Sequence, residues 1–152
     1  MKQLVLLFFL LTLNKVYAQI SIVDIGDGWK QRVDSAITLV KTYDYDKYEV
    51  LVTHCKNVGF WDGPFSSIEN ENSIVITKND IKGKSLNNIA AILVHESKHL
   101  ELLSRDKNTD ENLEEFICYS YEYDFLKKIP NVEIWLLDNA LYMLDYYSKK
   151  TK

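Results

Sequence analysis

The sequence lacks the features that mark several protein classes. Its apolar run from Leu4 to Leu13 is well short of the roughly 20 residues that span a bilayer. It has no basic tract that could follow a phosphate backbone, so nucleic acid is not expected as a partner. It also has no repeat, low-complexity tract or interior linker, and its 152 residues fit one domain.

The first eighteen residues have the pattern of a secretory signal peptide. Lys2 supplies a positive start, Leu4–Leu13 an apolar segment, and Val16–Ala18 a cleavage signature of small-residue type. We therefore expect residues 1–18 to be removed, leaving a single domain of residues 19–152 that is secreted or periplasmic and has no stable membrane insertion. An uncleaved membrane anchor is the alternative. Cleavage would lower Lys+Arg from 18 to 16 against 22 acids, so the net charge would change from −4 to −6.

Cysteine is scarce, with only Cys55 and Cys118. In an exported chain such a pair is a candidate disulfide, but each residue can equally be a small apolar side chain in a core. Neither is expected to bind zinc, because two histidines and a carboxylate already make a sufficient catalytic set.

Periodicity and turn residues predict an α+β fold with a small antiparallel or mixed sheet beside helices. The second predicted strand ends in a turn at residues 79–83, and Ser85 is the expected N-cap of the helix that follows. The predicted elements, in order, are a helix at 27–42, a strand at 48–55, a loop or bent hairpin at 57–67, a strand at 73–77, and helices at 85–105, about 112–128 and 132–147.

The most informative stretch is His95-Glu96-Ser97-Lys98-His99. On a helix the i, i+4 spacing places His95 and His99 on one face, where both rings can reach one zinc ion. Glu96 is rotated about 100° around the axis, which suits a general base beside the metal. Only three histidines occur in the chain, and this motif holds two of them.

The motif points toward the apolar face of its predicted helix. With His95 at zero on a helical wheel, the apolar side chains fall between roughly 60° and 160°, and Glu96 lies in the middle of that arc. Polar groups on an apolar face need partners, and a metal would supply them. The competing interpretation, a solvated helix without metal, would place His95 and Glu96 opposite the leucines. The apolar residues of the arc are Ile89, Ile92, Leu93, Leu100 and Leu103.

The next helix offers a third metal ligand. Glu115 and Glu122 lie nearly opposite its predicted solvent face, whereas Glu114 lies at the border of that face. We therefore expect Glu115 to be the ligand, Glu122 to orient a ligand histidine, and Glu114 to contribute little.

HESKH, followed about fifteen residues later by EEFICYSYEYDFL, resembles the gluzincin metallopeptidases, in particular their small members. The resemblance covers roughly residues 73–126. It implies a zincin-like domain in which His95, His99 and Glu115 bind one Zn²⁺ per chain and Glu96 is the general base. It also implies a peptide or protein substrate, which would pair with the short strand Ser73–Thr77 at the edge of the cleft.

One feature departs from the family. Larger gluzincins supply a His or Tyr that stabilises the oxyanion from a C-terminal subdomain, for which this chain is too short. His54 and the tyrosines of the helix predicted at about 112–128 (Tyr119, Tyr121 and Tyr123) are available, but such residues more often have a structural role. An inert binding module braced by zinc is therefore the rival interpretation of the same motif.

Overall fold

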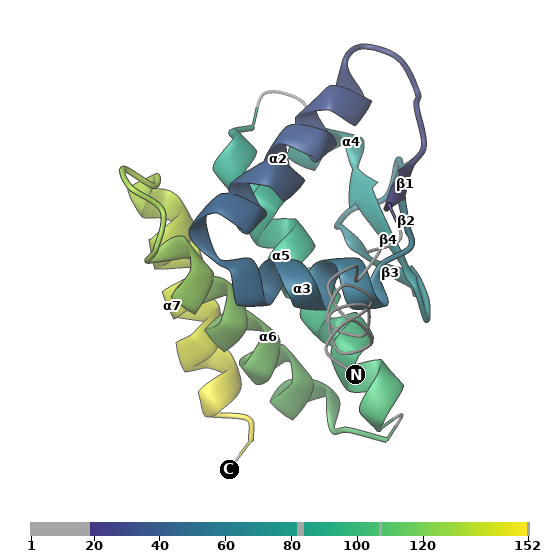
Figure 1. Cartoon of the computed structure of the whole chain (residues 1–152). Coiled ribbons are helices and arrows are strands. Elements are labelled where there is room, and N and C mark those ends of the chain that lie inside the picture. The colour runs from purple at the N-terminus through teal and green to yellow at the C-terminus, as the bar shows by residue number, and fades with distance from the viewer. Residues whose placement is uncertain (1–18, 82–83, 107, 152) are drawn as a thin grey trace, which may run out of the picture.

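The computed structural model describes residues 19–81, 84–106 and 108–151; the predicted signal peptide lies outside them. Within this part the protein is α+β, with a mixed four-stranded sheet and six helices (Figure 1). None of the described helices is long and apolar enough to cross a membrane. The elements are β1 (Ser21–Ile22), α2 (Trp29–Tyr43), α3 (Tyr45–His54), β2 (Asn57–Trp61), β3 (Ser67–Asn70), β4 (Ser73–Thr77), α4 (Lys78–Ile81), α5 (Leu86–Arg105), α6 (Glu111–Leu126) and α7 (Ile134–Ser148).

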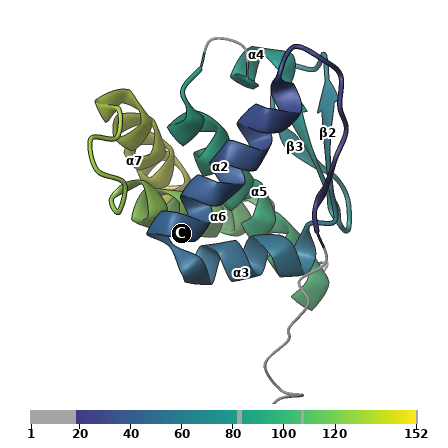
Figure 2. The same ribbon diagram turned by 45° about the horizontal axis from the view of Figure 1, so that its top comes forward.

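Helix α5 lies at the centre of the fold and carries the His-Glu motif. The sheet lies on one side of it and the α6–α7 pair on the other (Figures 1 and 2), while α2 and α3 also pack against it. Ser85 caps the helix as predicted, because its side chain accepts a hydrogen bond from the Asn88 N–H. Leu93 and Leu100 are fully buried, and each such side chain contributes about 1.5–3 kcal/mol of hydrophobic stabilisation.

The strand predicted at Tyr48–Cys55 is wrong, since this segment forms most of α3. Lys47, Leu51 and Val52 are buried along one face of this helix, and Asp44 caps its first turn through the Lys47 N–H. Packing of this face against α5 outweighs the β propensity of the Val- and Tyr-rich sequence.

The sheet has the order β1-β2-β4-β3, with β1, β2 and β4 parallel and β3 antiparallel to β4. The strand at Ser73–Thr77 was predicted correctly, but its position at the edge of the sheet was not. It is β4, an interior strand paired on both sides, and four of its five residues are buried. Strands β1 and β3 were not predicted, and the segment predicted as a loop or bent hairpin contains β2. Of the turn predicted at 79–83, residues 79–81 belong to the short helix α4, and residues 82–83 lie outside the described part of the chain.

Candidate metal centre

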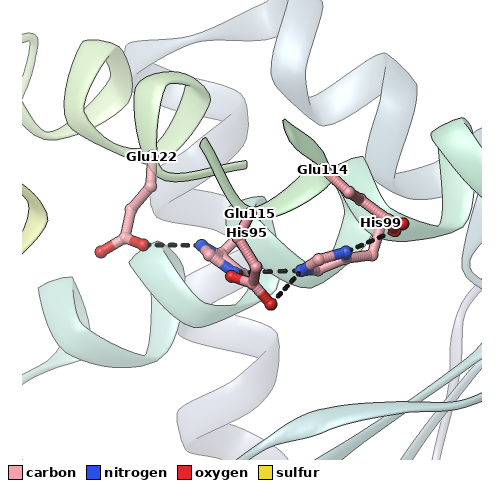
Figure 3. Close-up of polar contacts among 5 residues, drawn as sticks. All are labelled: His95, His99, Glu114, Glu115 and Glu122. Atoms are coloured by element: carbon pink, nitrogen blue, oxygen red, sulfur yellow. Dashed lines mark hydrogen bonds and ion pairs between the residues drawn. The ribbon is translucent and has the colours of Figure 1, made fainter. Parts of the chain in front are cut away.

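Helices α5 and α6 pack side by side and bring their polar side chains together (Figure 3). His95 and Glu96 are buried, with 7% and 8% of their surfaces exposed, so the motif points into the protein as the helical wheel predicted. The solvated-helix interpretation does not describe this structure. Helix α6 is held at its start by Asp110, which accepts hydrogen bonds from the N–H groups of Asn112 and Leu113.

The Nε2 atoms of the two histidines converge on the carboxylate of Glu115. They are 3.2 Å apart, and each lies 3.6 Å from one oxygen of Glu115, His99 from Oε1 and His95 from Oε2 (Figure 3). Ligand atoms about 2.0–2.1 Å from a tetrahedral zinc ion are themselves about 3.3–3.4 Å apart. The distance between the two nitrogens is close to this spacing, and the distances to the Glu115 oxygens are slightly longer.

A second pair of carboxylates fixes the orientation of the two rings. Glu122 Oε2 lies 2.9 Å from His95 Nδ1, as expected for an orienting residue, and Glu114 Oε1 lies 2.7 Å from His99 Nδ1 (Figure 3). Such contacts place the Nδ1 proton toward the carboxylate and leave Nε2 free to bind a metal. The expectation that Glu114 is a bystander on the surface is wrong, because its side chain is only 25% exposed and contacts a ring.

Cys118 lies in the same cluster, although the sequence analysis expected neither cysteine to bind zinc. A ligand atom of each of His95, His99 and Cys118 lies within 4.8 Å of the others, and these residues form a group that can hold a metal ion such as zinc. Cys118 follows Glu115 by three residues, so both lie on the α6 face that meets α5. Burial raises the pKa of its thiol, which favours the protonated form in the absence of a metal.

Neither cysteine forms a disulfide. Cys55 and Cys118 are both free and buried, and the Cys55 thiol donates a hydrogen bond to the Asn57 carbonyl oxygen at 3.2 Å. Cys55 belongs to the hydrophobic core, as the alternative reading of the sequence held.

The electrostatics of the cluster are those of a site that attracts cations. Burial lowers the pKa of His95, but the carboxylates of Glu115 and Glu122 outweigh it and raise the value to about 10. Burial raises the pKa of Glu96 to about 7, although the charge of His95 opposes the shift. Burial and the neighbouring His95 lower the pKa of His99. The carboxylates therefore stabilise a positive charge on the His95 imidazole, and they would stabilise a metal cation in the same way.

A cleft of about 350 Å³ opens beside the cluster and reaches His95, Glu96 and Tyr119. The ring of Tyr119 meets the His95 ring edge to face, with centroids 4.4 Å apart. Apolar side chains from three segments form much of the remaining wall: Phe65, Ala91, Ile92, Trp135 and Leu136.

Other residues considered from the sequence lie elsewhere. His54 ends α3 near Glu101 and does not line the cleft. Tyr121 packs against the ammonium groups of Lys47 and Lys98, at 3.4 and 4.9 Å from the ring centroid, and Tyr123 lies under Lys127. Of these tyrosines only Tyr119 lines the cleft.

No protein-family model matches the sequence, and no curated protein matches it.

Proposed function

We propose that this protein is an exported zinc-dependent metallopeptidase that hydrolyses peptide bonds. The observation that carries the proposal is the convergence of the two Nε2 atoms on the Glu115 carboxylate, with each Nδ1 held by a further glutamate. Three carboxylates and two imidazoles are buried or half-buried at this position. Their burial costs free energy unless a cation binds there.

In this proposal His95, His99 and Glu115 hold the metal. Zinc held by these three residues would lower the pKa of a water molecule to about 7 and would polarise a carbonyl group. Glu96 then accepts a proton from the attacking water and returns it to the leaving amine. Its location at the wall of the cleft suits this role, and the Ile68 N–H on β3 donates a hydrogen bond to it.

Strand β3 supports a polypeptide substrate. In the described part of the chain it pairs only with β4, so no strand lies on its other side. An extended peptide can add to such an edge through main-chain hydrogen bonds. Because Ile68 of this strand contacts Glu96, a peptide bound there would pass close to the proposed base.

Cys118 favours a second candidate, the inert binding module braced by zinc. Structural zinc sites usually have four protein ligands, whereas catalytic sites keep one position open. If the Cys118 sulfur joins the two histidines and Glu115, no position remains for water. The two candidates therefore differ in one ligand and in activity.

The test compares the wild type with Glu96→Gln and with a matched control, Glu101→Gln. Glu101 lies on the same helix and is equally buried, at 7% exposed against 8% for Glu96, but it pairs with Lys98 and Arg105 away from the cleft. We expect Glu96→Gln to keep zinc and its melting temperature yet lose cleavage of a peptide library, because an amide cannot accept the proton.

Glu101→Gln should cleave peptides at the wild-type rate. If Glu96→Gln cleaves as fast as the wild type, Glu96 is not the base. A wild type that binds zinc but cleaves no library peptide would establish the inert module instead.

A further inference from the structure

A second cavity lies at the carboxyl ends of the parallel strands, apart from the candidate metal centre. Its volume is about 580 Å³. The segment after β1 contributes Ile25 and Asp27, the end of β2 contributes Trp61, and α4, which follows β4, contributes Lys78. Crevices at this end of parallel strands are common ligand sites, because several loops meet there.

Aromatic side chains form one wall of this cavity. Trp29 is buried and meets Phe60 edge to face, with ring centroids 5.2 Å apart, while Trp61 is 40% exposed. Gly63 lets the Trp61 indole lie against the backbone, since a Cβ at this position would be 2.2 Å from the ring. Such a wall attracts a cation through the faces of its rings.

Three charged side chains line the described part of the cavity, and two of them pair with each other. Lys78 Nζ lies 2.7 Å from Asp62 Oδ2, so these two charges offset each other. Asp27 is exposed, has a left-handed backbone with φ of 54°, and pairs with no cation among the residues that the structure describes. The formal charges of the described side chains that line the cavity therefore sum to −1, which complements a single positive charge.

Two segments of the chain contribute residues both to this cavity and to the cleft beside the metal centre. The end of β2 contributes Trp61 to the cavity, and the loop that follows it contributes Phe65 to the cleft. The Trp61 Nε1–H donates a hydrogen bond to the Phe65 carbonyl oxygen at 3.1 Å. Helix α4 likewise contributes Lys78 to the cavity and Asp80 to the cleft. One polypeptide crossing this loop could therefore contact both.

We infer that this cavity binds an arginine or lysine side chain of a polypeptide, between the Asp27 carboxylate and the rings of Trp29 and Trp61. That this polypeptide is the substrate rests on the proposed function, whereas the binding itself does not. The site would select substrates that carry a basic residue at some distance from the bond to be cleaved.

The three tryptophans of the chain allow a direct test. Trp29 and Trp61 line this cavity and Trp135 lines the metal cleft, so three indole N–H signals report on the two sites. The probe is acetyl-Gly-Gly-Arg-Gly-Gly-amide, titrated into ¹⁵N-labelled Glu96→Gln protein at low salt. Its control replaces arginine by citrulline, which has nearly the same shape and no charge.

We expect the Trp29 and Trp61 signals to move with the arginine peptide, the Trp135 signal to stay, and the citrulline peptide to bind more weakly. Asp27→Asn should weaken binding about fivefold, the upper range for an exposed ion pair. Trp61→Leu should weaken it to a similar extent through the lost ring face. Asp24→Asn is the matched control: it removes the same charge from the same segment outside the cavity.

Equal binding of the two peptides, movement of Trp135 alone, or equal effects of Asp24→Asn and Asp27→Asn would each overturn the inference. The assay requires neither zinc nor hydrolysis, because it measures binding alone. A negative result here therefore leaves the proposed peptidase intact, and a failure of zinc binding or cleavage leaves this site intact.

Discussion

Glu115→Ala is expected to reduce zinc affinity more than any other single substitution on α6. The Glu115 carboxylate has one oxygen 3.6 Å from the Nε2 of each histidine, and the alanine variant leaves only the two imidazoles of the proposed ligand set. A site with three protein ligands then becomes one with two.

The zinc affinities of Glu114→Ala and Glu122→Ala serve as the comparison for the loss expected from Glu115→Ala. Each removes a carboxylate from an Nδ1 atom, at 2.7 Å on His99 and 2.9 Å on His95, and leaves the proposed ligands in place. Loss of such an orienting contact typically costs about 10–100-fold in metal affinity, or about 1.4–2.7 kcal/mol. Glu115→Ala should exceed this range. Glu111→Ala, in the exposed first turn of the same helix, is the control and should bind zinc as the wild type does.

The assay is competition with a zinc chelator, accompanied by visible and near-ultraviolet spectra of the cobalt-substituted protein. Cobalt reports a thiolate ligand through a charge-transfer band that carboxylate and imidazole ligands do not give. If Glu115→Ala keeps its affinity while Cys118→Ser loses both zinc and that band, the ligand set is His95, His99 and Cys118. The reasoning from the Glu115 distances would then be refuted.

Three further outcomes are expected. The mature protein should hold about one zinc per chain, and removal of zinc by a chelator should lower the melting temperature, because a ligand that binds only the folded state stabilises it; an unchanged melt would contradict this. Zinc affinity, measured by chelator competition at a series of pH values, should fall as the pH falls, because both imidazoles must be neutral to bind; a flat profile would exclude histidine ligands. Ser85→Ala should lower the free energy of unfolding in urea by about 1 kcal/mol through loss of the N-cap of α5, whereas Ser35→Ala, at an exposed position within α2, should cost less.

The helices that carry the candidate site could be predicted, because their sequences show the helical spacing of apolar residues and the capping residues at the ends. Ser85 precedes a long apolar stripe on α5. Two of the three buried polar residues of the motif, His95 and Glu96, lie on this stripe or at its border. Helix α3 could not be read in the same way. Its residues have β propensity, and the contact with α5 that makes them helical is not visible in the local sequence.

The partners of the histidines could be predicted only in part, because some of them depend on contacts that the local sequence does not show. A helical wheel gives the angle of a residue but not the reach of its side chain, so Glu114 was assigned to the surface although its carboxylate reaches His99. Cys118 had a usable signal, since Glu115, Cys118 and Glu122 share one face at i, i+3 and i+7. The edge position of β3 depends on pairing between strands, which follows from no single segment.

The cluster is also local along the chain, because His95 and Glu122 are 27 residues apart and His99 and Glu114 only 15. Closing a loop costs entropy that grows slowly with its length, about 0.6 kcal/mol for each doubling, so these contacts are among the least costly long-range contacts to form. The α5–α6 hairpin holds every proposed ligand, whereas the sheet supplies none. We therefore expect metal capture during folding to require only this hairpin and to precede the ordering of the strands.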